Sequence, residues 1–65
     1  MMTQAELESL VGLGAEEARR RVEAKGWRFR VLIEDGVGRP STTDLRDDRV
    51  NVTVVAGKVE RADVG

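Results

Sequence analysis

The sequence predicts an α+β fold in which one helix packs on a small mixed three-stranded sheet, with a long exposed loop between a parallel strand pair. Three observations support this prediction: a helix-like segment at 15–25, a segment of alternating apolar and polar residues at 27–33, and two short strand-like segments at 50–55 and 58–62. A two-residue turn makes the last two strands antiparallel, whereas the long connection before them permits a parallel pairing. One helix would then cover one face of the sheet.

The helix at 15–25 is indicated by the residues at its two ends. Glu16 and Glu17 fall in its first turn, where carboxylates interact favourably with the positive end of the helix dipole. Lys25 falls in its last turn, and Gly26 is a suitable stop. The apolar stripe is narrow and made of small side chains, so we expect the helix to lie close against a flat surface. The stripe comprises Ala15, Ala18 and Val22.

The three strands are predicted from alternation with a period of two. The odd positions of the first strand and the even positions of the second are expected to face the core. The turn Ala56-Gly57 leads into the third strand, in which Val59 is expected to point inward. The other residues expected to point inward are Trp27, Phe29, Val31, Ile33, Val50, Val52 and Val54.

Two segments fall outside these elements. Residues 1–9 are predicted to form a short helical lead-in that lacks a good cap. Residues 34–48 are predicted to form a loop, because they hold the single proline, two glycines and several small polar residues. A loop of this length in a small domain is usually functional or disordered, so it is the first candidate for a binding site. With no repeat and no low-complexity tract, residues 1–65 are expected to form a single domain.

Composition and charge exclude several classes of function. The 65 residues carry 11 basic and 12 acidic side chains, so no field of one sign is expected to attract nucleic acid or an anionic membrane. Cysteine and histidine are both absent, which excludes disulfides, thiol nucleophiles, histidine bases and most transition-metal sites. The start of the chain lacks the features of a signal peptide, which leaves a cytoplasmic protein or the processed form of a secreted one. We therefore expect a binding protein that needs no metal and no cofactor, and not an enzyme.

Five short segments resemble a known family. They are Leu10-Val11-Gly12, Glu17-Ala18-Arg19, Thr42-Thr43-Asp44-Leu45-Arg46, Arg49-Val50 and Val64-Gly65. Together they resemble the potato inhibitor I family of serine protease inhibitors, which includes eglin c and the barley chymotrypsin inhibitor. The resemblance is closer still to the short bacterial and fungal elastase inhibitors of that family, and it covers roughly residues 10 to 65.

The resemblance implies a serine protease inhibitor that acts by a reversible, substrate-like mechanism. The scissile bond would be Thr43-Asp44, with Thr43 filling the primary specificity pocket of the protease. The loop residues in contact with the protease would be Pro40, Ser41, Thr42, Thr43, Asp44 and Leu45. Arg46 and Arg49 would support the loop from behind, and Asn51 stands where many members of the family carry a second supporting arginine. The partner would be a serine protease of subtilisin, chymotrypsin or elastase type, bound by a monomer.

Two alternatives stay open at the level of the sequence. The chain could be a module with the inhibitor fold that has lost inhibition and serves as a protein-interaction or structural domain. Arg46 and Arg49 could also be ordinary surface residues that pair loosely with Asp47 and Asp48. A rigid loop would favour inhibition, because a flexible one would lose much conformational entropy on binding and would then be cut as a substrate.

Overall fold

The computed structural model describes residues 2–42 and 44–65, and it has the predicted α+β class. Its sheet has four strands in the order β2-β1-β3-β4, so the prediction of three strands was wrong by one. The elements are α1 (Gln4–Glu8), α2 (Ala15–Ala24), β1 (Arg28–Glu34), β2 (Val37–Gly38), β3 (Arg49–Val55) and β4 (Lys58–Val64).

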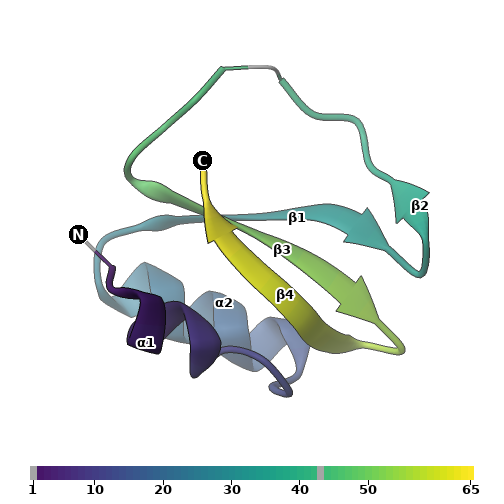
Figure 1. The fold of residues 1–65 in the computed structure, drawn as a ribbon, viewed down its shortest axis with the longest axis horizontal. Coiled ribbons are helices and arrows are strands. Elements are labelled where there is room, and N and C mark those ends of the chain that lie inside the picture. Colours follow the sequence, from purple (N-terminus) through teal and green to yellow (C-terminus); the bar gives the residue numbers. More distant parts are fainter. Residues whose placement is uncertain (1, 43) are drawn as a thin grey trace.

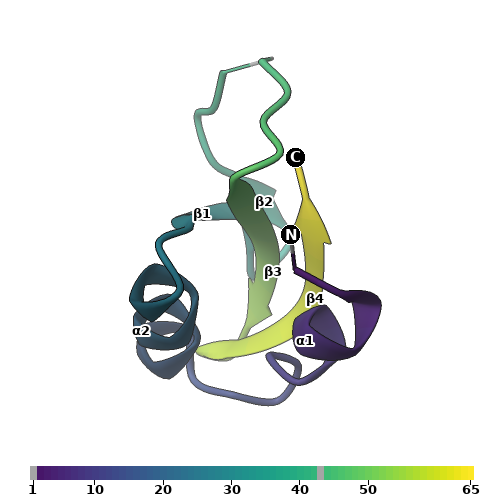
Figure 2. The same cartoon turned by 90° about the vertical axis from the view of Figure 1, so that its left-hand side faces the viewer.

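The sheet separates the two helices from the long loop. The central strands β1 and β3 are parallel, as the sequence predicts, while β4 pairs antiparallel with β3 and β2 antiparallel with β1. α2 lies against β1 and β4, and α1 lies against β4. The connection from β2 to β3 arches on the side of the molecule away from both helices, and β4 ends on that same side (Figures 1 and 2).

The additional strand β2 shortens the loop that the sequence predicts over 34–48. Asp35 and Gly36 form a tight turn with positive φ angles of 50° and 80°, and this turn folds β2 back onto the end of β1. The Asp35 carboxylate accepts a hydrogen bond of 2.8 Å from the Ala56 amide of the neighbouring turn. The exposed loop therefore begins at residue 39 and ends at residue 48. The Asp35-Gly36 pair is typical of a hairpin turn. The strand that follows, β2, has only two residues, which are too few to show alternation.

The core lies between the helices and the sheet and is made mostly of aliphatic side chains. In β3 the even positions face the core and are at most 1% exposed, which leaves the odd positions on the loop side. The expected inward position of Val59 is also confirmed, at 2% exposed. The buried cluster comprises Met2, Leu7, Leu10, Ala18, Val22, Val50, Val52, Val54 and Val59.

The first residues of the chain contribute more to the core than a lead-in would. Thr3 caps α1 through a capping box, in which its hydroxyl accepts from the Glu6 amide and the Glu6 carboxylate accepts from the Thr3 amide. The expectation of a poorly capped segment was therefore wrong. Leu7 in α1 and Leu10 just after it are 7% and 2% exposed, and α1 lies against β4 beside α2.

The first strand is less buried than its alternation predicts. Trp27, just before β1, and Phe29 and Val31 within it pack against the core, yet all three are only partly buried. β2 pairs only with the end of β1, so most of β1 lies at the edge of the sheet. The Arg19 guanidinium lies over the Phe29 ring, 5.6 Å from its centroid, and covers part of that exposed edge.

Candidate functional site

The exposed loop (residues 39–48) is bonded to the sheet at both ends. At its start the Arg39 amide donates to the Leu32 carbonyl over 2.9 Å, and the Arg39 side chain pairs with Glu34. At its end the Arg28 amide donates to the Asp48 carbonyl over 2.8 Å. Between these two points the described side chains of the expected contact segment are exposed. They are Pro40, Ser41, Thr42, Asp44 and Leu45.

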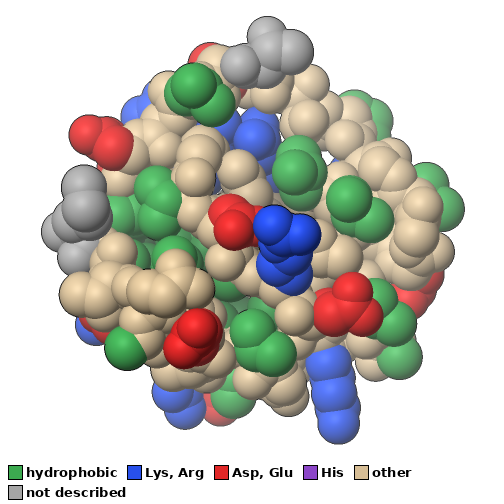
Figure 3. Space-filling model, viewed as in Figure 1, with side chains coloured by type: hydrophobic (Ala, Val, Ile, Leu, Met, Phe, Trp, Pro, Cys, Tyr) green, Lys and Arg blue, Asp and Glu red, His purple; other side chains and the backbone are tan. Residues whose placement is uncertain are grey.

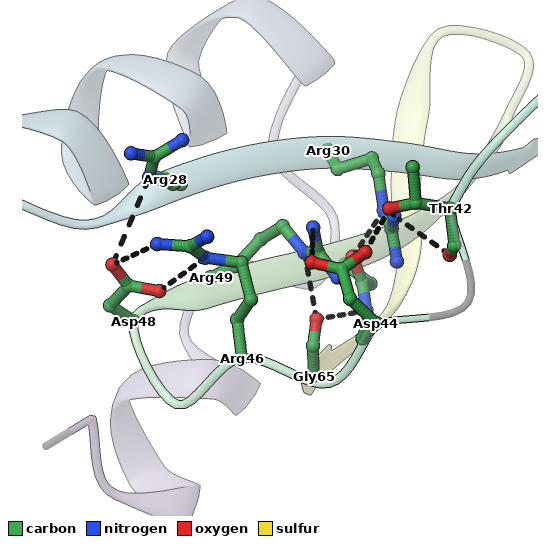
Figure 4. A network of polar contacts seen from close by, with 9 residues as sticks. Arg28, Arg30, Thr42, Asp44, Arg46, Asp48, Arg49 and Gly65 are labelled. Carbon is green, nitrogen blue, oxygen red and sulfur yellow. Dashed lines mark hydrogen bonds and ion pairs between the residues drawn. The ribbon is translucent and has the colours of Figure 1, made fainter.

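Arg49, at the start of β3, supports the loop from below. Among the residues that the structure describes it is the one buried charged side chain, at 8% exposed, so it needs polar partners. Its Nη2 donates to the Asp44 carbonyl over 2.9 Å, and its Nε donates to the Gly65 carbonyl over 2.8 Å. Its Nη1 also lies 3.6 Å from the Asp44 carboxylate. The guanidinium therefore joins the loop to the end of β4 (Figure 4).

Asn51 lies two residues further along β3, on the same side of the sheet. Its Nδ2 donates to the Gly65 carbonyl over 2.9 Å, and its Oδ1 accepts a bond of 2.8 Å from Arg30 Nε. The Arg30 guanidinium continues toward the loop, where its Nη1 lies 3.4 Å from both the carbonyl and the hydroxyl oxygen of Thr42. Among the contacts of the described residues, Asn51 thus reaches the loop only through Arg30.

The polar groups around Asp44 favour its ionised form. The Thr42 hydroxyl donates to the Asp44 carboxylate, and this bond is the main reason that the pKa of Asp44 is lowered. The positive charges of Arg49 and Arg30 lower the pKa further, against partial desolvation, which raises it. The carboxylate can therefore accept hydrogen bonds at neutral pH.

Arg46, the other arginine expected to support the loop, pairs with an acidic residue at the end of the loop. Its Nε and Nη2 donate to the two carboxylate oxygens of Asp48 over 2.9 and 3.1 Å. This pair raises the pKa of Arg46 and lowers that of Asp48. In the described part of the chain, Arg46 makes no hydrogen bond to residues 40–45. The pair lies at the end of the loop next to β3, and a pairing of Arg46 with Asp48 is one of the two interpretations that the sequence left open.

The expected site residues thus lie partly on the exposed loop and partly beneath it or at its end. Thr43, expected to fill the specificity pocket, lies outside the described residues. Its neighbours Thr42 and Asp44 are bonded to arginines from two different strands. Arg30 is the contact that sequence reasoning missed. The available signal was the alternation of β1, which places Arg30 on the side opposite Phe29, but its pairing with Asn51 required the parallel register.

The described residues were also searched for a metal site, a membrane-spanning helix and a charged patch. No group of three or more potential metal-binding side chains occurs among them, and no helix that the structure describes is long and apolar enough to span a membrane. On the face drawn in Figure 3, acidic and basic side chains are interspersed and neither sign forms a continuous patch.

Comparisons with protein-family models, with curated proteins and with solved structures found no match to this chain. The geometry of the exposed loop and its supports, together with the resemblance of the sequence motifs, is therefore the basis for a functional proposal.

Proposed function

We propose that this protein is a serine protease inhibitor that presents residues 40–45 to the protease as a substrate-like segment. The observation that carries the proposal is the double support of an exposed loop. Asp44 is bonded to Arg49 on β3, and Thr42 is bonded to Arg30 on β1. The bond that the resemblance assigns as scissile, Thr43-Asp44, lies between these two supported residues.

Two supports on opposite sides of one bond are what a substrate-like inhibitor needs. A supported loop loses little conformational entropy when it binds, so more of the contact energy contributes to affinity. If the protease cuts the bond, Thr42 and Asp44 each keep a separate attachment to the sheet. The two new ends then stay close together, which favours religation over release of the cut chain.

Exposed apolar area on the loop gives the protease a second contact. Leu45 is 92% exposed, the largest fraction among the large apolar side chains described, and it directly follows Asp44. Burying a leucine side chain in a protease subsite contributes on the order of 1.5–3 kcal/mol. Thr43 has a short, branched side chain, which suits a small specificity pocket of elastase type better than a deep one.

The proposal can be tested by titration against subtilisin, chymotrypsin, trypsin and an elastase-type enzyme, with mass spectrometry of the incubated mixtures. We expect sub-micromolar inhibition of at least one enzyme and slow cleavage at Thr43-Asp44 alone. Leu45→Ala should weaken inhibition. Val37→Ala is the matched control, because Val37 is also exposed, at 67%, but lies outside residues 40–45.

Rapid cutting at several bonds within residues 39–48 without inhibition of any enzyme would refute the proposal. The remaining interpretation would then be a protein-interaction or structural module with this fold.

A further inference from the structure

The Arg30 side chain joins the middle of β1 to the exposed loop. Its Nη1 lies 3.4 Å from the Thr42 carbonyl and 3.4 Å from the Thr42 hydroxyl. We propose that Arg30 is a positioning residue, which holds the Thr42 backbone so that the loop binds a protease without being readily cut. This inference rests on the proposed function, since it assigns a role in the same site.

Arg30 is oriented by Asn51, its direct neighbour in the parallel register of β1 and β3. The bond of 2.8 Å from Arg30 Nε to Asn51 Oδ1 fixes the plane of the guanidinium and leaves Nη1 free to face the loop. Asn51 Nδ2 is bonded to the Gly65 carbonyl, so both ends of the amide are in use. The amide cannot turn over without losing both bonds. An asparagine and an arginine on adjacent strands therefore act together as one long support.

Thr42 depends on this support more than Asp44 does. Asp44 is bonded to the buried Arg49 guanidinium, whereas among the described contacts Thr42 reaches the sheet only through Arg30. The Thr42 hydroxyl accepts from Arg30 and donates to the Asp44 carboxylate. That hydroxyl therefore connects the two supports. Without Arg30, the side chain of Thr42 would keep, among the described contacts, only its hydrogen bond to the Asp44 carboxylate.

The contacts at 3.4 Å are long for hydrogen bonds, while the bond to Asn51 has an ordinary length. Hydrogen bonds of a site are often long in the free protein and shorten in the complex. Asn51 thus orients Arg30 before any protease binds, and we expect the contacts of Arg30 with Thr42 to shorten when a protease binds the loop.

Arg28 provides a matched control on the same strand. It lies two residues before Arg30, its side chain is 66% exposed, and its nearest ion pair is with Asp48 at 3.8 Å. Arg28→Met removes the same charge from β1 as Arg30→Met does, but it removes no contact with Thr42. Any difference between the two variants then reports on the support and not on the net charge.

The experiment compares the wild type, Arg30→Met, Arg30→Lys and Arg28→Met in three measurements. They are NMR order parameters of the Thr42 and Asp44 amides without protease, the rate of loop cleavage by a protease that the wild type inhibits, and urea denaturation. Arg30→Met should lower the Thr42 order parameter from about 0.85 toward 0.6. It should also raise the cleavage rate about tenfold, equivalent to about 1.4 kcal/mol.

Arg30→Lys should recover part of the loss, because it keeps the positive charge but replaces the fixed fork of guanidinium donors by a single ammonium group. Arg28→Met should resemble the wild type, and urea denaturation should confirm that all four proteins are folded under the assay conditions.

An unchanged Thr42 order parameter in Arg30→Met would overturn the inference, whatever the protease assay shows. So would equal effects of Arg28→Met and Arg30→Met. A wild type that inhibits no protease, combined with a loosened Thr42 in Arg30→Met, would refute the proposed function but support the positioning role in the loop.

Discussion

Replacing Arg49 by methionine should destabilise the whole protein as well as the loop. Methionine keeps most of the buried volume but removes two short hydrogen bonds, to the carbonyls of Asp44 and Gly65. A hydrogen bond from a charged group contributes about 1.5–3 kcal/mol, and we take the lower value for each bond because Asp44 is exposed and Gly65 is only partly buried. The expected loss is about 3 kcal/mol of a total stability that for 65 residues is on the order of 3–10 kcal/mol.

Urea denaturation followed by the fluorescence of Trp27 measures this loss. Trp27 is the only tryptophan and packs against the core, so its emission reports on global unfolding. Arg46→Met is the matched control, because Arg46 is a less buried arginine of the same loop region that pairs only with Asp48 in the described part of the chain. We expect a much smaller loss for Arg46→Met, since a solvated ion pair contributes little.

A loss below about 1 kcal/mol for Arg49→Met would refute the reasoning, because the two hydrogen bonds together are expected to contribute about 3 kcal/mol. Equal losses for Arg49→Met and Arg46→Met would refute it as well. In that case the burial of the Arg49 side chain would make no difference to its contribution to stability.

Two further predictions concern other parts of the chain. Ala56 has a positive φ of 51°, so Ala56→Asn should stabilise the protein by about 0.5–1 kcal/mol, measured by urea denaturation; a protein no more stable than the wild type would contradict this. The Lys25 ammonium, 2.6 Å from the Glu6 carboxylate, is the main cause that lowers the pKa of Glu6 from 4.5 to about 2. Because the folded-state pKa is lowered, this contribution to stability is complete above pH 4.5 and is lost as the pH falls through about 2. In an NMR titration of the carboxyl group, Lys25→Met should raise the Glu6 pKa toward 4.5; an unchanged value would refute the role of Lys25.

The main architecture was predictable because it depends on strong local patterns. Val50, Val52 and Val54 alternate with polar residues, and Gly57 marks a tight turn, so β3 and β4 follow directly from the sequence. α2 follows from its charged ends and from Gly26. Each of these patterns extends over several residues, and the apolar residues that they assign to α2 and β3 are the ones that pack together in the core.

The parts that were missed depend on short segments or on tertiary contacts. β2 has two residues, too few to show a period. α1 is capped by Thr3 and Glu6, a threonine and a glutamate at capping-box spacing, but its burial depends on contact with β4. Arg30 becomes a support only when the parallel register places it opposite Asn51. No pattern within one strand could have revealed that pairing.

The alternation along β3 also determines which genetic changes the protein can tolerate. Its even positions, such as Val50 and Val52, lie in the core. Its odd positions Arg49 and Asn51 lie on the opposite face, where Arg49 is bonded to Asp44 and Asn51 to Gly65. Codon substitutions at the odd positions could therefore alter the loop supports while the valines of the core remain. Deletion or insertion of a single codon at the start of β3 would exchange the two sets and turn a guanidinium toward the core. This strand can thus diversify by point substitution, whereas we expect length changes to be restricted to the turns and the exposed loop.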